Sequence, residues 1–291
     1  MSSHPQAAPL IQKMRKSSLR IAKARSIFRL KSKLARNCLS EFLGTAMLLF
    51  LGLSVSMQFI LSNGVISSWF HVNFGWGLAL TFSALATYQT SGGHLNPAIS
   101  LLMVTLEKLP HSHLLPFIIA QLSGAIVGSI GPYYLYQDQF KHFTSLKTLA
   151  FPGLAACFTS FPELHVSNGT AFFDQIAGTG VLAFCICLCI DRRNKVPVFL
   201  QPLFFGLVLT MIGCSLSLNV GYPLNPARDL GPRLFAAYLY GIEVFSYHDW
   251  YFWIPLVAPC IGAIVGGWAY QIFIGIQIDD DHEEYELKVS N

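Results

Sequence analysis

Asn96-Pro97-Ala98 and, 129 residues later, Asn225-Pro226-Ala227-Arg228-Asp229 are the two stretches that decide the fold. Asn is a good helix N-cap and Pro suits the first helical position, so each stretch predicts the start of a helix. The apolar segments that follow, 97–106 and 226–240, are too short to span a bilayer, since ten helical residues cover about 15 Å of a core about 30 Å thick. Each stretch therefore predicts a half-helix that enters a membrane without crossing it.

The composition of the whole chain points to a lipid environment. Of its 291 residues, 53% are hydrophobic and 12% are charged, whereas an ordinary soluble domain has about 25% charged residues. Residues 1–38 hold ten Lys and Arg, and residues 279–286 hold six acids. The net charge of +4 is therefore a sum of opposite tails and indicates no nucleic-acid partner. This composition excludes a disordered chain and a typical cytosolic enzyme.

Six segments are apolar and long enough to span a bilayer. They are residues 39–62, 74–90, 114–136, 172–190, 197–218 and 250–276. With the two half-helices, they predict an all-α membrane protein of six transmembrane helices. The chain then divides into a basic N-tail (1–38), a membrane domain (39–276) and an acidic C-tail (277–291).

The basic residues orient this membrane domain. Lys and Arg flank membrane helices on the cytosolic side, which places both tails and the 191–195 loop in the cytosol. The connecting loop 137–171 then lies outside the cell, where Asn168-Gly169-Thr170 is an N-glycosylation sequon. We expect a multi-pass protein of the plasma membrane with both termini cytosolic.

The two halves of the membrane domain, about 39–136 and 172–276, repeat each other. Glu41–Thr45 resembles Gln175–Thr179, Trp76–Leu78 resembles Phe205–Leu207, and Gly124–Gly128 is identical to Gly262–Gly266. Each half has three spans, so the second copy must enter the membrane in the opposite orientation, and the two Asn-Pro-Ala turns meet near the midplane. The paired glycines predict close helix packing.

The meeting point has a defined electrostatic character. Two half-helix N-termini, each with an effective charge of about +0.5, repel cations and protons. The amides of Asn96 and Asn225 can donate hydrogen bonds to the oxygen of a small neutral solute. Arg228 is costly at this depth unless it faces a water-filled cavity. Because side chains at i and i+1 of a helix do not face each other, we expect Asp229 to pair with Arg233 and Arg228 to face the lumen.

Four polar side chains are expected to support the half-helix loops: Asp229, Glu41, Gln175 and His94. Glu41 and Gln175 begin spans at equivalent positions of the repeat and should hydrogen-bond to these loops. His94, two residues before Asn96, should be a neutral imidazole bonded to loop backbone; the alternative is a pH-sensitive gate, because His titrates near neutral pH. The seven Cys are interpreted as free thiols, and we expect no metal, no cofactor and no enzyme activity.

The paired Asn-Pro-Ala motifs, the second extended to Asp229, resemble the major intrinsic protein family, and the aspartate resembles its aquaglyceroporin branch. The resemblance covers about residues 38–276. It implies an aquaporin-like fold and a homotetramer with one pore per subunit. It also implies passive permeation of glycerol and water, with urea and other small neutral solutes.

The resemblance further implies a selectivity filter. Its positions lie 20 residues before the first motif Asn, and 12 and three residues before the second; here they hold Trp76, Gly213 and Tyr222, with Arg228 as the fourth member. Water-selective members have His where this chain has Gly213, so a small residue there favours a wider, glycerol-permeable constriction. The alternatives are a water-selective pore, an ion channel, a structural junction protein and a membrane enzyme.

Overall fold

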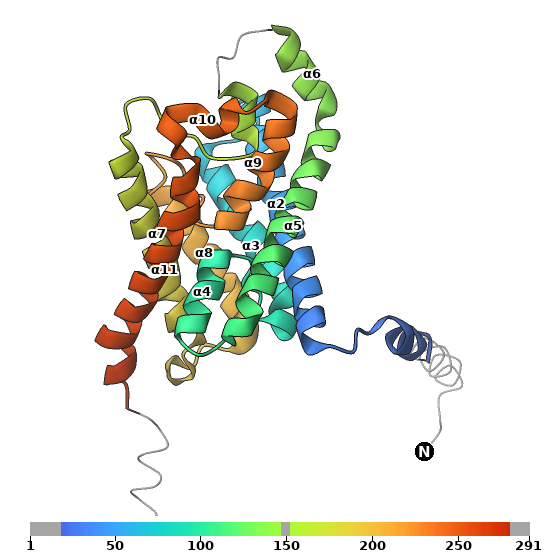
Figure 1. Ribbon diagram of the computed structural model, residues 1–291, viewed down its shortest axis with the longest axis vertical. Coiled ribbons are helices and arrows are strands. Elements are labelled where there is room, and N and C mark those ends of the chain that lie inside the picture. The colour runs from blue at the N-terminus through green and yellow to red at the C-terminus, as the bar shows by residue number, and fades with distance from the viewer. Residues whose placement is uncertain (1–18, 147–151, 280–291) are drawn as a thin grey trace, which may run out of the picture.

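The computed structural model describes residues 19–146 and 152–279, which form a helical bundle without a strand among them (Figure 1). The first repeat contains α2 (Lys33–Leu61), α3 (Trp69–Ser91), α4 (Pro97–Thr105) and α5 (His111–Leu135). The second contains α7 (Asn168–Ile190), α8 (Gln201–Ser215), α9 (Pro226–Tyr240) and α11 (Ile254–Phe273). Both ends of the described chain lie at one end of the bundle, the terminal end; α6 and α10 lie at the other, the loop end (Figure 1).

The predicted spans correspond to six long helical segments. Five of them, those containing α2, α5, α7, α8 and α11, are long and apolar enough to cross a membrane. The sixth, α3, has 23 residues and is therefore about 34 Å long. It is less apolar because it buries Asn73, Thr81, Ser83 and Thr87 inside the bundle. Its exposed side chains include Phe70, Phe74 and Phe82.

Both half-helices begin at their predicted residues, Pro97 and Pro226. The first long helix differs more from its prediction, since α2 starts at Lys33, six residues before the predicted span. The hydroxyl of Ser32 accepts a hydrogen bond from the backbone N–H of Ala35 and caps α2 there. The helix therefore continues beyond its apolar segment into basic sequence.

The short helices α6 and α10 are not expected from the sequence. α6 (Gln137–Leu146) lies inside the predicted connecting loop, which also holds the 3-10 turn η1 (Gly153–Cys157), and α10 (Glu243–Trp250) precedes α11. α6 buries Phe140, whose ring lies 5.7 Å from the ring of Phe158. Segments this short are well below the length that spans a membrane, so the pattern of apolar residues does not predict them.

Glycines bring the two repeats together. α3 and α8 cross at Gly77 and Gly206, which are equivalent residues of the repeat, and a Cβ on either would overlap the carbonyl oxygen of the other. The identical Gly124/Gly128 and Gly262/Gly266 pairs do the same within each repeat, because α5 packs on the backbone of α2 and α11 on that of α7. Their predicted role in close packing is confirmed.

Each half-helix packs against the last helix of the other repeat. Gly231 of α9 lies against Ala125 of α5, and Gly267 of α11 lies against Leu102 of α4. These contacts fix α4 and α9 with their N-termini toward each other inside the bundle.

Candidate functional site

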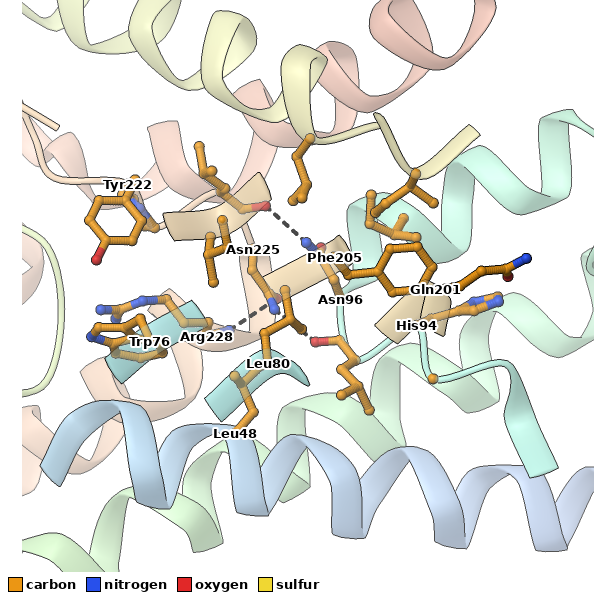
Figure 2. A pocket seen from close by; sticks show the side chains of 18 of the residues that line it. Leu48, Trp76, Leu80, His94, Asn96, Gln201, Phe205, Tyr222, Asn225 and Arg228 are labelled. Atoms are coloured by element: carbon orange, nitrogen blue, oxygen red, sulfur yellow. Dashed lines mark hydrogen bonds between the residues drawn. The ribbon is translucent and has the colours of Figure 1, made fainter. Parts of the chain in front are cut away.

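A cavity of about 510 Å³, the central cavity, lies between the half-helices. Its lining extends from Trp69 and Val220 toward the loop end to Lys108 and Arg192 at the terminal end. Both motif asparagines lie between these two groups. Figure 2 shows the order along the cavity, with Tyr222, Trp76 and Arg228 on one side of the asparagines and His94 and Gln201 on the other.

The two motif asparagines are held reciprocally. The Oδ1 of Asn96 accepts from the N–H of Ala98 at 2.9 Å, and its Nδ2 donates to the carbonyl of Leu224 at 2.9 Å. The Oδ1 of Asn225 accepts from the N–H of Ala227 at 3.0 Å, and its Nδ2 donates to the carbonyl of Leu95 at 2.7 Å (Figure 2). An amide nitrogen carries two hydrogens, so each Asn keeps a second N–H.

Glu41 holds the first half-helix loop. Its carboxylate is fully buried, and one oxygen accepts hydrogen bonds from the hydroxyl of Ser91 and the backbone N–H of His94. The other accepts from the N–H of Leu95 at 2.7 Å and from Nε2 of Gln121 at 2.8 Å. Four donors therefore satisfy one buried carboxylate, and two of them belong to the loop before Asn96.

Gln175 holds the second half-helix loop with fewer contacts. Its Oε1 accepts from the N–H of Leu224 at 3.1 Å, and its Nε2 donates to Asp174 at 3.0 Å. The other oxygen of Asp174 accepts from Asn219 of the same loop at 2.9 Å. The structure thus places both polar residues where the repeat predicts them.

His94 differs from its prediction in the partner of its ring. Its Nδ1 lies 3.1 Å from the hydroxyl of Ser100, in α4, and not against loop backbone. The ring packs on Phe117 with centroids 5.4 Å apart, and the residue lines the central cavity. The hypothesis of a pH-sensitive gate stays a prediction.

Arg228 and Trp76 stack on each other in the wall of the central cavity. The guanidinium carbon lies 4.5 Å from the centroid of the indole ring, which is the geometry of a cation–π contact. Nη1 of Arg228 donates to the carbonyl of Phe158 at 3.3 Å, and the indole N–H of Trp76 donates to Ser56 at 2.9 Å. Among the described residues Arg228 has no ion pair. Both side chains are thus oriented without the cation being neutralised.

Gly213 shapes this region indirectly. It is buried and does not itself line the central cavity, whereas Tyr222 does. A Cβ at Gly213 would lie 2.7 Å from Cζ of Tyr222 and 2.8 Å from Oδ1 of Asn73. The absent side chain therefore admits the Tyr222 ring, whose hydroxyl is buried with no hydrogen-bond partner in the described structure.

Asp229 pairs with Arg233, as the spacing predicts, at 2.8 Å and with both side chains buried. The second oxygen of Asp229 accepts from the N–H and the hydroxyl of Ser160. Arg233 donates to the carbonyls of Ser160 and Val244 at 2.7 and 2.6 Å. The Asp229–Arg233 pair holds Ser160 and so fixes the segment that contains Phe158, whose carbonyl accepts a hydrogen bond from Arg228. Asp229 therefore helps to position Arg228 but does not neutralise its charge.

Comparison with known proteins identifies this arrangement. Residues 29–270 match the family model described as major intrinsic protein. The chain belongs to the major intrinsic protein family. It is 38% identical over 266 residues to aquaporin-10 of Homo sapiens, covering 90% of this chain and 88% of the relative. It is also 39% identical to aquaglyceroporin-2 of Rhizophagus irregularis, over 79% of this chain and 74% of the relative.

A solved structure agrees with the family assignment. The X-ray structure of the aquaglyceroporin from Plasmodium falciparum has a TM-score of 0.76 and 32% identity, covering 84% of this chain and 98% of that one. This major intrinsic protein is therefore an integral, multi-pass membrane protein with six membrane helices and two half-helices. Its predicted fold class is confirmed.

Several supporting residues of this major intrinsic protein could not be found from its sequence. Gln121 bridges Glu41 to Ser100, and Ser160 receives Asp229. At the terminal end, the hydroxyl of Tyr88 donates to Gln201, which lines the central cavity. These partners lie far apart in the chain and follow no motif spacing, so no pattern points to them.

Asn168, the predicted glycosylation site, is the first residue of α7. Its Nδ2 lies 3.3 Å from the carbonyl of His248 and 3.4 Å from that of Asp249. The atom that a glycan would occupy thus already holds α10 in this major intrinsic protein.

Proposed function

We propose that this protein is a passive channel for glycerol and water, with urea and other small neutral solutes as further substrates. The observation that carries the proposal is the stacked pair of Arg228 and Trp76 in the wall of the central cavity, with Tyr222 in the space left by Gly213. The guanidinium offers fixed, planar donors to hydroxyl groups. The two aromatic rings form an apolar corner for the carbon edge of a polyol.

The remainder of the central cavity also suits hydroxylated solutes. Gly93, His94, Tyr222 and Pro223 line it in non-helical segments, and no hydrogen bond within the described residues ends on their carbonyl oxygens. Such oxygens can accept the protons of water or glycerol, while the motif asparagines donate. Many weak sites of this kind allow a solute to pass without being held.

We propose that protons and cations are excluded at the same place. Both half-helix N-termini point into the bundle, and Arg228 adds a full positive charge without an ion pair in the described structure. Because Leu95 and Leu224 each fix one N–H of a motif Asn, these amides keep their donor orientation. A passing water then accepts from both amides, which interrupts a chain of proton transfer.

We further propose a plasma-membrane location, cytosolic termini and a homotetramer. Basic residues gather at the terminal end, among them Lys108, Arg192 and Lys195, which favours the cytosol for that end. The central cavity lies within one chain, so each subunit of a tetramer would have its own pathway. Asn168 then faces outward, and a glycan there would replace its bonds to α10.

Stopped-flow light scattering on proteoliposomes tests the proposed function. We expect fast shrinkage in an impermeant osmolyte, and fast reswelling in an inward glycerol gradient. Fast shrinkage without accelerated reswelling in glycerol would contradict the proposal and indicate a water channel.

The Gly213→His variant tests the filter itself. An imidazole at this position displaces the Tyr222 ring and narrows the central cavity, so glycerol flux should fall well before water flux. Ser215→His, which introduces the same side chain at an exposed position of α8, is the matched control and should leave both fluxes unchanged. Equal loss of glycerol and water flux in Gly213→His would contradict the filter assignment.

A further inference from the structure

A second cavity, of about 750 Å³, opens at the terminal end of the bundle. We call it the terminal cavity. Its walls come from the turn after α4 (Thr105–Lys108), the segment after α7 (Ile190–Arg193), and the end of α11 with the following 3-10 turn, η5 (Gly275–Gln277). α4 and α11 pack against each other there (Figure 1). The terminal cavity thus joins segments of both repeats.

Two cationic side chains of the terminal cavity have no acidic partner. Lys108 and Arg192 line it from different turns, and neither makes an ion pair within residues 19–146 and 152–279. Arg193 also lines the cavity, but its guanidinium binds the carboxylate of Asp191 at 2.8 Å. The free cations are therefore Lys108 and Arg192.

The acids of the terminal cavity do not cancel this charge. Both oxygens of Asp191 are occupied, one by the backbone N–H and Nε of Arg193 and the other by Nη2 of Arg193 and the hydroxyl of Tyr270. The hydrogen bonds from Arg193 hold the pKa of Asp191 down to about 2. Glu107 is the remaining acid, exposed and without an ion pair among the described residues. The unpaired groups thus carry one positive charge in excess.

Apolar side chains form the other part of the terminal cavity. Trp268 lines it and donates its indole N–H to Thr105 at 3.1 Å. Ile276, also in the lining, is 69% exposed, and nearby Phe273 is 74% exposed. Trp residues gather where hydrocarbon meets water in membrane proteins. The terminal cavity therefore opens at the depth of the lipid head groups.

We propose that the terminal cavity binds a phosphomonoester lipid, with its phosphate between Lys108 and Arg192 and its acyl chains along Trp268 and Ile276. Near neutral pH a phosphomonoester carries a charge of about −1.5 to −2 and three acceptor oxygens, so it can bind Lys108 and Arg192 at the same time, whereas a phosphodiester has two free oxygens and a single charge. Arg192 offers a planar fork to phosphate oxygens and Lys108 a compact charge. Basic cavities between membrane helices are a known form of lipid recognition.

The terminal cavity shares residues with the central cavity. Lys108 and Arg192 line both, so a lipid phosphate that fixes these two side chains also changes the terminal mouth of the central cavity. Solute flux should then depend on lipid composition. This last step rests on the proposed function, whereas binding of the lipid does not.

Native mass spectrometry of the full chain in detergent tests the binding directly. The probes are phosphatidic acid, which is a phosphomonoester, and phosphatidylserine, an anionic lipid without one. We expect phosphatidic acid to be retained preferentially, and the double variant Lys108→Met/Arg192→Gln to retain it about 25-fold less, since each basic side chain near an anionic surface contributes about fivefold. Glu107→Gln should raise retention, because it removes the opposing charge.

Two further measurements distinguish the site from diffuse attraction and from misfolding. Lys195→Met removes a cation from the same turn but outside the terminal cavity, and should retain phosphatidic acid as the wild type does. The variants should keep the wild-type circular dichroism spectrum. Equal retention of both lipids, or equal loss in Lys195→Met, would overturn the proposal. Displacement of phosphatidic acid by inorganic phosphate alone would overturn the lipid as the ligand.

Discussion

At the scale of single residues, the backbone conformations of Leu95 and Leu224 depend on tertiary contacts. Each precedes a motif Asn and has a positive φ, 52° and 49°, which costs a non-glycine residue about 1–2 kcal/mol. In this conformation each carbonyl accepts from the Asn of the opposite motif. Repeat symmetry predicts that the motifs meet, but nothing in Leu predicts a left-handed backbone, because only the tertiary contacts stabilise it.

Among the side chains of the candidate site, too, some contacts follow from the sequence and others depend on tertiary packing. The pairing of Asp229 with Arg233 follows from their i, i+4 spacing on one helix. The hydrogen bonds from Ser160 to Asp229 and from Gln121 to Glu41 join residues 69 and 80 positions apart. Such contacts depend on how the helices pack, so local sequence carries no signal for them.

Asp191 allows a pH prediction at this scale. Its pKa is lowered from 3.8 to about 2, first by hydrogen bonds from the Arg193 side chain. A lowered pKa in the folded state stabilises the fold above pH 4, and this contribution is lost as the pH falls toward 2. Asp191→Asn should therefore lower the stability by about 1–2 kcal/mol at pH 7, and the difference from wild type should shrink in acid.

Thermal unfolding in detergent between pH 7 and pH 2 measures this effect. Asp138→Asn is the control, because Asp138 forms an ion pair with Lys141 whose two side chains are 94% and 66% exposed. Such a pair adds little stability, so the control should unfold with the wild type throughout. A constant deficit of Asp191→Asn across this pH range would contradict the argument.

At the scale of helices, the accuracy of prediction follows the strength of the terminal signals. The starts of α4 and α9 were predicted to the residue, because Asn at the N-cap and Pro at the first position act locally. α2 begins earlier than predicted, since no apolar signal marks its basic first turns. α6 and α10 carry no comparable signal, because both are too short to span a membrane.

The contact of α4 with α11 gives a prediction at this scale. A Cβ at Gly267 would lie 2.7 Å from Cδ2 of Leu102. Gly267→Val should therefore displace α4, lower the stability by about 1–3 kcal/mol through overpacking, and reduce water and glycerol flux together. The smaller substitution Gly267→Ala should reduce flux for the same reason. Adding Leu102→Ala, which removes the side chain that the new Cβ meets, should restore part of that flux. Stopped-flow light scattering checks both, and an absence of rescue would show that this contact does not position α4.

At the scale of the whole molecule, the two repeats share geometry but differ in chemistry. Each motif Asn binds the loop of the opposite repeat, and Gly77 and Gly206 meet at equivalent positions. The residues that support the loops are not equivalent. Glu41 is a carboxylate with four donors, whereas Gln175 is an amide that accepts from Leu224 and donates to Asp174. The symmetry of the fold therefore does not make these residues interchangeable.

Exchanging the two side-chain types tests this conclusion. In Glu41→Gln the new NH₂ group meets donors only, so a buried hydrogen bond is lost at a cost of about 1–3 kcal/mol, and the loop before Asn96 loosens. In Gln175→Glu the new carboxylate faces that of Asp174 without a donor between them. Both variants should unfold at lower temperature and lose glycerol flux, and Asp174→Asn should rescue only Gln175→Glu, because Asp174 belongs to the second loop. Rescue of both variants, or of neither, would contradict the assignment of a separate support to each half-helix.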